Sequence, residues 1–282
     1  MAPDLYCVLG NPIAHSRSPW IHTRFAALTG ESLAYEPRLV PLGGFAQALA
    51  ELAAAGGRGC NVTVPFKLDA ARCAHTHSAR VQLAGAANTL VLGPDGAVHA
   101  DNTDGLGLVA DIVQGAGRAI AGADVLLIGA GGAAAGALAP LLAQGPRRVV
   151  VANRTPARAE ELVARHAAAA APHKTQLLAQ ALQGVDGDFD LLINASASSL
   201  AGAAVPVPAR VLRAGSLAYD MMYGPPAQGF LDWATRHGAQ PRDGLGMLVE
   251  QAAEAFALWR GLRPPAAQVL AELRALQAAG AP

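Results

Sequence analysis

Lysine is rare in this chain, which otherwise uses arginine for positive charge. Lys67 and Lys174 are its only lysines, although Lys and Arg together number 21. A lysine can be tuned to release its proton, whereas an arginine in a protein stays protonated. In the segment NVTVPFK (61–67), apolar and more polar residues alternate, which predicts a half-buried strand ending at Lys67. Lys67 is therefore a candidate proton carrier; the alternative is a solvated lysine at a strand end.

A second candidate group is the polar turn DNTDG (101–105), which holds two carboxylates, an amide and a hydroxyl. It follows a short apolar segment and precedes GLGLVADIV (105–113), so an ordinary capped turn at a helix start is one interpretation. We also expect a domain boundary near Asp104, and clefts between domains commonly bind substrates. A carboxylate of Asp104 beside Lys67 would stabilise and orient the ammonium, giving an acid–base pair.

Two hydroxyls precede the first expected helix. Ser16 and Ser18 lie in NPIAHSRSP (11–19), just before the helical segment that ends near Gly30. Helix N-termini favour anions, so a small carboxylate substrate could bind there. The alternative is that Ser18 only caps the helix.

The turn GAGGAA (129–134) directly follows the buried run DVLLIG (124–129) and opens a helix rich in small residues. Gly129 would permit a tight turn, Gly131 would let a pyrophosphate approach the backbone, and Ala134 takes the third small position. Small residues also serve plain helix–sheet packing, but the strand, turn, helix and following strand together favour dinucleotide binding.

The end of the next strand indicates which dinucleotide is bound. An NAD enzyme places Asp or Glu about 20 residues after the glycines, to bind the ribose 2′-hydroxyl. This chain instead has Asn153, Arg154 and Thr155, followed by Arg158. Two arginines with an amide and a hydroxyl would hold a 2′-phosphate, so we predict NADP(H). The same residues could also cap the helix that Pro156 begins.

Buried β runs alternate with helical segments through the middle of the chain, which predicts an α/β fold with a parallel sheet. We expect an N-terminal α/β substrate-binding and catalytic domain over 1–104, completed by returning C-terminal helices over 244–282. A Rossmann-type, doubly wound domain binding NADP is expected over 105–243.

The overall composition excludes several classes of protein. With 21 acidic and 21 basic side chains, nothing indicates nucleic acid or an anionic membrane as a partner. Three cysteines without a CxxC spacing suggest reduced thiols, and with no expected signal peptide or membrane span we predict a cytoplasmic protein. The HxH of His75 and His77 lacks further ligands, so no metal is expected.

Several longer motifs occur together and in a fixed order between residues 10 and 253. They are GNPIAHSRSP, GCNVTVPFK, GAANTL, DNTDG, IGAGGA, NRT with Arg158, YDMMY and DGLGMLVEQAA. In this combination the chain resembles the shikimate dehydrogenase family, NADP-dependent oxidoreductases of aromatic amino-acid (chorismate) biosynthesis. The resemblance implies reversible NADPH-dependent reduction of 3-dehydroshikimate to shikimate.

The resemblance also implies roles for individual residues. The catalytic pair is Lys67 and Asp104. The substrate-binding residues are Ser16 and Ser18 with Tyr223 at the carboxylate, and Thr63, Asn88 and Gln251 with Asp104 at the ring hydroxyls. The glycine-rich turn that binds the cofactor comprises Gly129, Ala130, Gly131, Gly132 and Ala133. The 2′-phosphate clamp comprises Asn153, Arg154, Thr155 and Arg158, and Met221, Gly244 and Met247 lie near the nicotinamide. No macromolecular partner is implied, and the protein is expected to be a monomer or homodimer.

The chain departs from the family pattern at a few positions. The third Rossmann strand is followed by ASASSLAG, with its glycine delayed to Gly202, and Ala134 and Ala135 replace a hydroxyl and a charge. Ala87 replaces a valine.

Three other interpretations remain. One is a quinate/shikimate dehydrogenase of broader substrate and cofactor use, another is a non-catalytic NADP-binding sensor, and a third is an unrelated reductase sharing only the glycine-rich turn.

Overall fold

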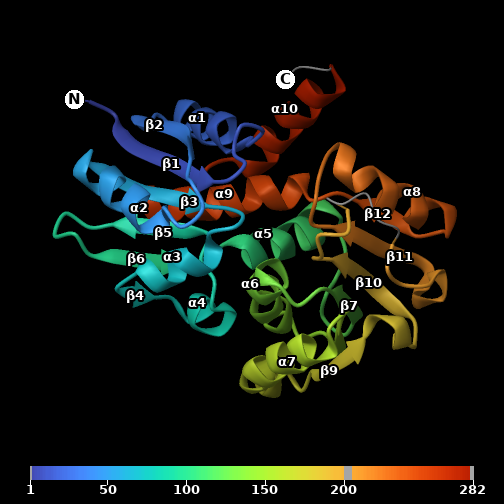
Figure 1. The fold of residues 1–282 in the computed structure, drawn as a ribbon. Helices are drawn as coiled ribbons and strands as arrows, with labels where there is room; N and C mark the ends of the chain where they lie inside the picture. The colour runs from blue at the N-terminus through green and yellow to red at the C-terminus, as the bar shows by residue number, and fades with distance from the viewer. Residues whose placement is uncertain (1, 200–204, 280–282) are drawn as a thin grey trace. The chain divides into compact units, whose positions relative to one another are not determined.

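The computed structural model describes residues 2–199 and 205–279 and divides the chain into two compact units. Unit 1 comprises Met1–Gly107 with Leu248–Pro282, and unit 2 comprises Leu108–Met247. The chain enters unit 2 within α5 (Asp104–Ala110) and returns to unit 1 within α9 (Leu245–Arg260). The expected return of the C-terminal helices to the first domain is confirmed (Figure 1).

Unit 1 contains a mixed six-stranded sheet in the order β2-β1-β3-β5-β6-β4. Its strands are β1 (Asp4–Gly10), β2 (Leu33–Leu39), β3 (Gly57–Val62), β4 (Thr76–His77), β5 (Thr89–Leu92) and β6 (Val98–Asp101). β1, β2 and β3 are parallel, whereas β5 is antiparallel to both of its neighbours. The helices of this unit include α1 (Ser18–Thr29), α2 (Phe45–Ala54), α3 (Lys67–Cys73), α4 (Ala79–Ala84) and α10 (Ala266–Ala278).

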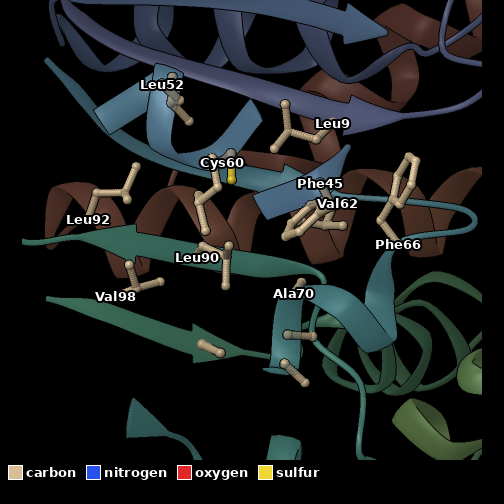
Figure 2. Packing of buried hydrophobic residues seen from close by; sticks show 14 of the residues in the cluster. Leu9, Phe45, Leu52, Cys60, Val62, Phe66, Ala70, Leu90, Leu92 and Val98 are labelled. Carbon is tan, nitrogen blue, oxygen red and sulfur yellow. The ribbon is translucent and has the colours of Figure 1, made fainter. Parts of the chain in front are cut away.

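Alternation along β1 assigns its side chains to two separate cores. Cys7 and Leu9 belong to a buried cluster that includes Cys60 and Val62 of β3 and Phe45 of α2 (Figure 2). The intervening residues of β1, Tyr6 and Val8, pack in another cluster with Tyr35 and Trp259. Because successive strand side chains point to opposite faces, the apolar run of β1 covers both faces of the sheet.

Unit 2 contains an all-parallel six-stranded sheet in the order β12-β11-β10-β7-β8-β9. Its strands are β7 (Asp124–Ile128), β8 (Arg148–Asn153), β9 (Gln176–Ala181), β10 (Phe189–Asn194), β11 (Leu212–Asp220) and β12 (Gln240–Arg242). Read from β9, this is the 3-2-1-4-5-6 order of a Rossmann fold, so the predicted fold class is confirmed.

Helices flank this parallel sheet, as the fold class requires. They are α6 (Gly132–Leu142), α7 (Pro156–Ala170) and α8 (Gln228–Arg236), with a π-helix, η1 (Asp111–Gly115). Short 3₁₀ turns are η2 (Ala171–His173), η3 (Leu182–Gly184), η4 (Ala209–Val211) and η5 (Pro225–Ala227). Figure 1 shows α7 beside β9 and α8 beside β11 and β12.

Two local predictions were wrong. The strand expected over 61–67 ends at Val62, and Lys67 is instead the first residue of α3. Pro65 has no N–H for a strand ladder, and the Phe66 N–H donates to the Thr63 carbonyl (3.0 Å) to close a turn. Ser18 does not cap α1 but begins it, and its own N–H donates to Ser16 Oγ at 3.3 Å.

In the described ranges no helix has both the length and the apolarity needed to cross a membrane.

Candidate active site

The predicted site residues of unit 1, apart from Gln251, lie along one edge of its sheet. The chain leaves β1 at Gly10, β3 at Val62 and β6 at Asp101, and it enters the antiparallel β5 at Thr89. The register pairs Leu9 with Val62, Asn61 with Thr89, and Thr89 with Asp101, so these ends are adjacent. Such strand ends are where α/β folds commonly bind ligands.

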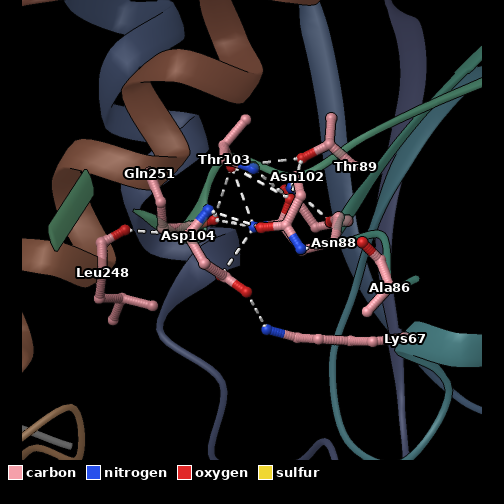
Figure 3. A network of polar contacts seen from close by, with 10 residues as sticks. Lys67, Ala86, Asn88, Thr89, Asn102, Thr103, Asp104, Leu248 and Gln251 are labelled. Atoms are coloured by element: carbon pink, nitrogen blue, oxygen red, sulfur yellow. Dashed lines mark hydrogen bonds and ion pairs between the residues drawn. The ribbon is translucent and has the colours of Figure 1, made fainter. Parts of the chain in front are cut away.

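Lys67 and Asp104 meet at this edge. Lys67 Nζ lies 2.5 Å from Asp104 Oδ2 (Figure 3). The Asp104 side chain is 7% exposed and that of Lys67 is 21% exposed, so the lysine is the more accessible member of the pair. The first turn of α3 and the first turn of α5 therefore supply one partly accessible ammonium–carboxylate pair.

Asn88 holds the other oxygen of Asp104. Its Oδ1 accepts from the backbone N–H of Thr103 (2.8 Å), a group that can only donate. This contact fixes the orientation of the amide, so Nδ2 donates to Asp104 Oδ1 at 2.8 Å. The carboxylate of Asp104 is thus held from two sides, by Asn88 at one oxygen and Lys67 at the other.

Neighbouring polar side chains complete a buried network around Asn88 (Figure 3). Gln251 of α9 accepts from Asn88 Nδ2 at 3.1 Å and donates to the Leu248 carbonyl at 2.8 Å. The Thr89 hydroxyl donates to Asn88 Oδ1 at 2.9 Å, and Asn102 Oδ1 accepts from the Asp104 N–H at 3.2 Å. The sequence analysis noted the amide of Asn102 and the hydroxyl of Thr103 only as part of the turn DNTDG, and it gave Thr89 no role of its own. The further signal common to all three is position, since each lies within two residues of a predicted site residue.

Ser16 and Thr63 lie on the loops that follow β1 and β3, and Ser18 is the first residue of α1. Ser18 is buried at the start of α1, and Ser16 is partly exposed. The Thr63 N–H donates to the Leu9 carbonyl at 2.9 Å, and a Cβ on Gly10 would meet its methyl group, so Gly10 allows the two loops to approach each other closely.

In unit 2, the predicted cofactor residues also lie where parallel strands end. Gly129 follows β7 with φ +109°, a conformation that favours glycine, and a Cβ there would lie 3.0 Å from the Ala195 carbonyl oxygen. Gly131 occupies the N-cap position of α6, and a Cβ on it would meet nothing within 4 Å. Since no side chain caps α6, the open turn fits a pyrophosphate approaching its N–H groups. Ala130, Gly132 and Ala133 complete the turn.

The predicted 2′-phosphate residues follow β8. Asn153 is its last residue and donates to the Thr155 carbonyl at 2.9 Å. Arg154, Thr155 and Arg158 are exposed, and neither arginine forms an ion pair with any residue that the structure describes. Thr155 occupies the N-cap position of α7 without a side-chain cap bond, and Pro156 starts the helix. The exposed guanidinium groups fit the charge of a phosphate.

Met221, Gly244 and Met247 come from the segments that follow β11 and β12. The Met221 N–H donates to the Asn194 carbonyl (3.0 Å), and the Gly244 N–H donates to the Met222 carbonyl (2.9 Å). Met247 is buried in the first turn of α9. Tyr223 also belongs to unit 2, whereas the other predicted substrate residues belong to unit 1.

The unusual loop after Ser196 begins in a polar cluster. The Ser196 hydroxyl donates to Asn194 Oδ1 at 2.7 Å, and Asn194 Nδ2 donates to Asp220 at 3.2 Å. Ser199 also donates to Asp220. Burial raises the pKa of Asp220, and its hydrogen bonds with Ser199 and Asn194 oppose that shift. Gly202 lies outside the described residues.

The HxH histidines are engaged by the backbone. His77 Nε2 lies 2.7 Å from the Ala71 carbonyl oxygen, and His75 Nδ1 accepts from the Val98 N–H at 3.0 Å. Among the described residues, no group of three or more His, Cys, Asp and Glu side chains could hold a metal ion.

Three family models match this chain in order. A shikimate dehydrogenase substrate-binding domain matches residues 8–90, shikimate/quinate 5-dehydrogenase matches 111–201, and a shikimate 5′-dehydrogenase C-terminal domain matches 244–274. A curated relative from Acidovorax sp. (strain JS42), shikimate dehydrogenase (NADP(+)), is 74% identical over 280 residues, which cover 99% of each chain.

Solved structures agree with these sequence matches. An Ael1 enzyme from Pseudomonas putida is 41% identical with a TM-score of 0.87, covering 96% of this chain and 98% of that one. Shikimate 5-dehydrogenase from Thermus thermophilus, solved in complex with NADP(H) and shikimate, is 32% identical with a TM-score of 0.82 at the same coverage. On these matches, and with the strand order and polar edge described above, the chain belongs to the shikimate dehydrogenase family.

Proposed function

We propose that this protein is an NADP-dependent shikimate dehydrogenase, an oxidoreductase that reversibly reduces 3-dehydroshikimate to shikimate in the biosynthesis of chorismate and aromatic amino acids. The structural observation that carries the proposal is the 2.5 Å contact between Lys67 Nζ and Asp104 Oδ2 at a ligand-binding edge of unit 1. The relative of 74% identity bears the same activity in its name.

Lys67 and Asp104 are the proposed catalytic pair. When bound, NADPH supplies the hydride for the ketone of 3-dehydroshikimate. The ketone oxygen needs a proton as it becomes a hydroxyl, and Lys67 Nζ is the proposed donor. Asp104 orients that ammonium, and Asn88 in turn holds Asp104 at its other oxygen. In the reverse reaction Lys67 accepts the proton. General acid catalysis of this kind typically contributes ~10²- to 10⁴-fold to the rate.

Polar groups at the strand edge match a small polyhydroxylated acid. We propose that Ser16, which precedes α1, and Ser18, which begins it, hold the substrate carboxylate together with Tyr223. Thr63, Asn88, Asp104 and Gln251 are proposed to bind the ring hydroxyls. Asn88 and Gln251 are already bonded to each other, so each hydroxyl would join an ordered network rather than order it on binding.

The cofactor is NADP(H), which the curated relatives use. We propose that the turn over 129–133 holds its pyrophosphate, since Gly131 leaves open space before an uncapped helix N-terminus. Arg154 and Arg158, with Asn153 and Thr155, would hold the 2′-phosphate. Met221, Gly244 and Met247 are proposed to lie beside the nicotinamide. On this assignment unit 1 is the substrate-binding and catalytic domain, close to the expected 1–104 with 244–282, and unit 2 is the NADP-binding domain, close to 105–243.

We further propose that the protein acts in the cytoplasm as a monomer or homodimer, without a macromolecular partner. Its three cysteines are free thiols, two of them buried, which suits a reducing compartment. The balance of 21 acidic and 21 basic side chains gives no electrostatic reason for binding nucleic acid.

A four-way assay tests the proposal. Shikimate and quinate are each supplied with NADP⁺ or NAD⁺, and absorbance of the reduced cofactor is followed. Shikimate with NADP⁺ should give the highest kcat/KM. Comparable rates with quinate or NAD⁺ would indicate the broader quinate/shikimate enzyme, and no turnover with any pair would indicate a non-catalytic NADP-binding protein.

A further inference from the structure

A buried ion pair lies in unit 2, outside the sites described above. Asp111, the first residue of η1, is 1% exposed. Arg242 at the end of β12 donates to it twice, from Nε to Oδ2 (2.8 Å) and from a terminal nitrogen to Oδ1 (2.5 Å). The two residues are 131 positions apart in the chain, so this contact depends on the fold of unit 2.

Tyr219 provides a third donor to the same carboxylate. Its hydroxyl lies 2.8 Å from Asp111 Oδ2, and the register of β11 and β12 pairs Tyr219 with Arg242. Burial raises the pKa of Tyr219 well above its usual range, so the hydroxyl keeps its proton and remains a donor. Asp111, Arg242 and Tyr219 together form what we term the Asp111 clamp.

Two glycines make room for this clamp. A Cβ on Gly115 would collide with the Asp111 carboxylate and with Arg242, and a Cβ on Gly246 would collide with the same carboxylate. Gly246 lies in the first turn of α9, where a negative charge is favourable. Asp111 therefore contacts the chain at Arg242, before Gly244, and at Gly246, after it.

The segment held between those contacts is short and closely packed. The Gly244 N–H donates to the Met222 carbonyl at 2.9 Å, and a Cβ on Gly244 would collide with the Met221 carbonyl. The segment 243–247 therefore has little freedom to move. Gly244 is held by its backbone contacts, and Asp111 contacts the chain at Arg242 and Gly246, on the two sides of Gly244. Two of its residues, Gly244 and Met247, are those proposed to lie at the nicotinamide.

We infer that Asp111, Arg242 and Tyr219 are positioning residues for hydride transfer, because they fix the backbone that carries Gly244 and Met247. The inference rests on the proposed function. Misplacement of a reacting group by about 1 Å can cost ~10²-fold in rate, so a clamp remote from the substrate can control turnover. A purely structural buried ion pair would affect stability alone.

Tyr219→Phe is the mildest test, since it removes one hydroxyl and keeps the ring. Ser216→Ala is its matched control: Ser216 lies on the same strand, is buried, and donates to the Phe189 carbonyl at 2.7 Å. Both variants are compared with the wild type by melting temperature and by kcat. The deuterium isotope effect on kcat is measured with shikimate deuterated at the carbon that gives up the hydride. Calorimetric affinities are measured for NADPH and for adenosine 2′,5′-bisphosphate, which lacks the nicotinamide.

We expect Tyr219→Phe to lower kcat about tenfold, increase the isotope effect and weaken NADPH binding several-fold, with affinity for adenosine 2′,5′-bisphosphate unchanged. Ser216→Ala should lower the melting temperature and leave the other quantities unchanged. Arg242→Lys keeps the positive charge but cannot form both hydrogen bonds to Asp111. It should therefore lower kcat, and it should weaken binding of NADPH relative to adenosine 2′,5′-bisphosphate, as Tyr219→Phe does.

A Tyr219→Phe enzyme that differs from wild type only in melting temperature would overturn the inference. So would equal weakening of NADPH and adenosine 2′,5′-bisphosphate. Failure of the proposed function itself would look different, because the wild-type protein would then neither oxidise shikimate with NADP⁺ nor bind adenosine 2′,5′-bisphosphate.

Discussion

At the scale of single residues, the two oxygens of Asp104 have different partners. Oδ2 faces the Lys67 ammonium and Oδ1 accepts from Asn88, whose own orientation is set by the Thr103 N–H. A carboxylate held at both oxygens keeps one direction, so the ammonium it contacts is also held in place. A Lys67 fixed in this way can serve as a proton donor at one defined atom.

Arg154 should determine the choice between NADPH and NADH. Arg154→Ala should raise KM for NADPH by about 10- to 100-fold, since charge-assisted bonds contribute roughly 1.5–3 kcal/mol. KM for NADH, which has no 2′-phosphate, should change less than about twofold. Arg165→Ala is the control, because Arg165 lies on α7, the helix that follows Arg154, and pairs with Glu161 (2.7 Å). Equal changes in the KM values for NADPH and NADH would contradict the assignment of Arg154 to the 2′-phosphate.

His22 should make unit 1 sensitive to acid. It is fully buried and stacked on Tyr35, with ring centroids 4.2 Å apart. Burial lowers its pKa from 6.5 to about 3. Between those values the unfolded chain binds a proton that the folded chain does not, so stability is full above pH 6.5 and falls as the pH is lowered.

The variant His22→Phe removes this titration. Wild-type protein should lose about 2 kcal/mol more unfolding free energy than His22→Phe between pH 7 and pH 5, because the loss is about 1.4 kcal/mol for each pH unit below 6.5. Urea unfolding at the two pH values measures this, with His15→Gln as an exposed-histidine control that should behave like the wild type. The same pH dependence in His22→Phe and wild type would refute the assignment.

At the scale of elements, two glycines in the turn between β7 and α6 have different roles: Gly129 allows the backbone conformation, and Gly131 leaves space for the cofactor. Gly129→Ala should destabilise the apo protein by ~1–3 kcal/mol, because φ is +109° and the Ala195 carbonyl oxygen is 3.0 Å away. Gly131→Ala should leave apo stability unchanged, since its Cβ meets nothing within 4 Å, yet it should weaken NADP⁺ binding by filling that space. Thermal unfolding and calorimetry measure both effects. Wild-type NADP⁺ affinity in Gly131→Ala would exclude the pyrophosphate assignment.

Elements with strong local signals could be predicted from the sequence, and those shaped by distant contacts could not. The run DVLLIG and its glycine turn correspond to β7 and the start of α6. The alternation in NVTVPFK predicted a strand, but Pro65 ends pairing there and Lys67 begins a helix. The edge strand β2 was not predicted, because Pro37 and the charged residues Glu36 and Arg38 interrupt its apolar pattern.

At the scale of the whole molecule, the family motifs predicted the order of the domains and the site residues, but the sequence could not predict the contacts between those residues. Asp104 and Lys67 are separated by 37 residues and Asn88 and Gln251 by 163, and only the sheet of unit 1 with α9 brings each pair together. The Asp111 clamp had no local sequence signal, since its partners come from η1, β11 and β12.

The most direct measurement is steady-state kinetics of Lys67→Ala with shikimate and NADP⁺, beside Lys174→Ala. Lys174 is the only other lysine and is exposed, so its variant removes the same charge elsewhere. We predict that kcat falls ~10²- to 10⁴-fold in Lys67→Ala while KM for shikimate stays within about threefold, and that Lys174→Ala resembles the wild type. A Lys67→Ala enzyme with near wild-type kcat would contradict the proton-donor role.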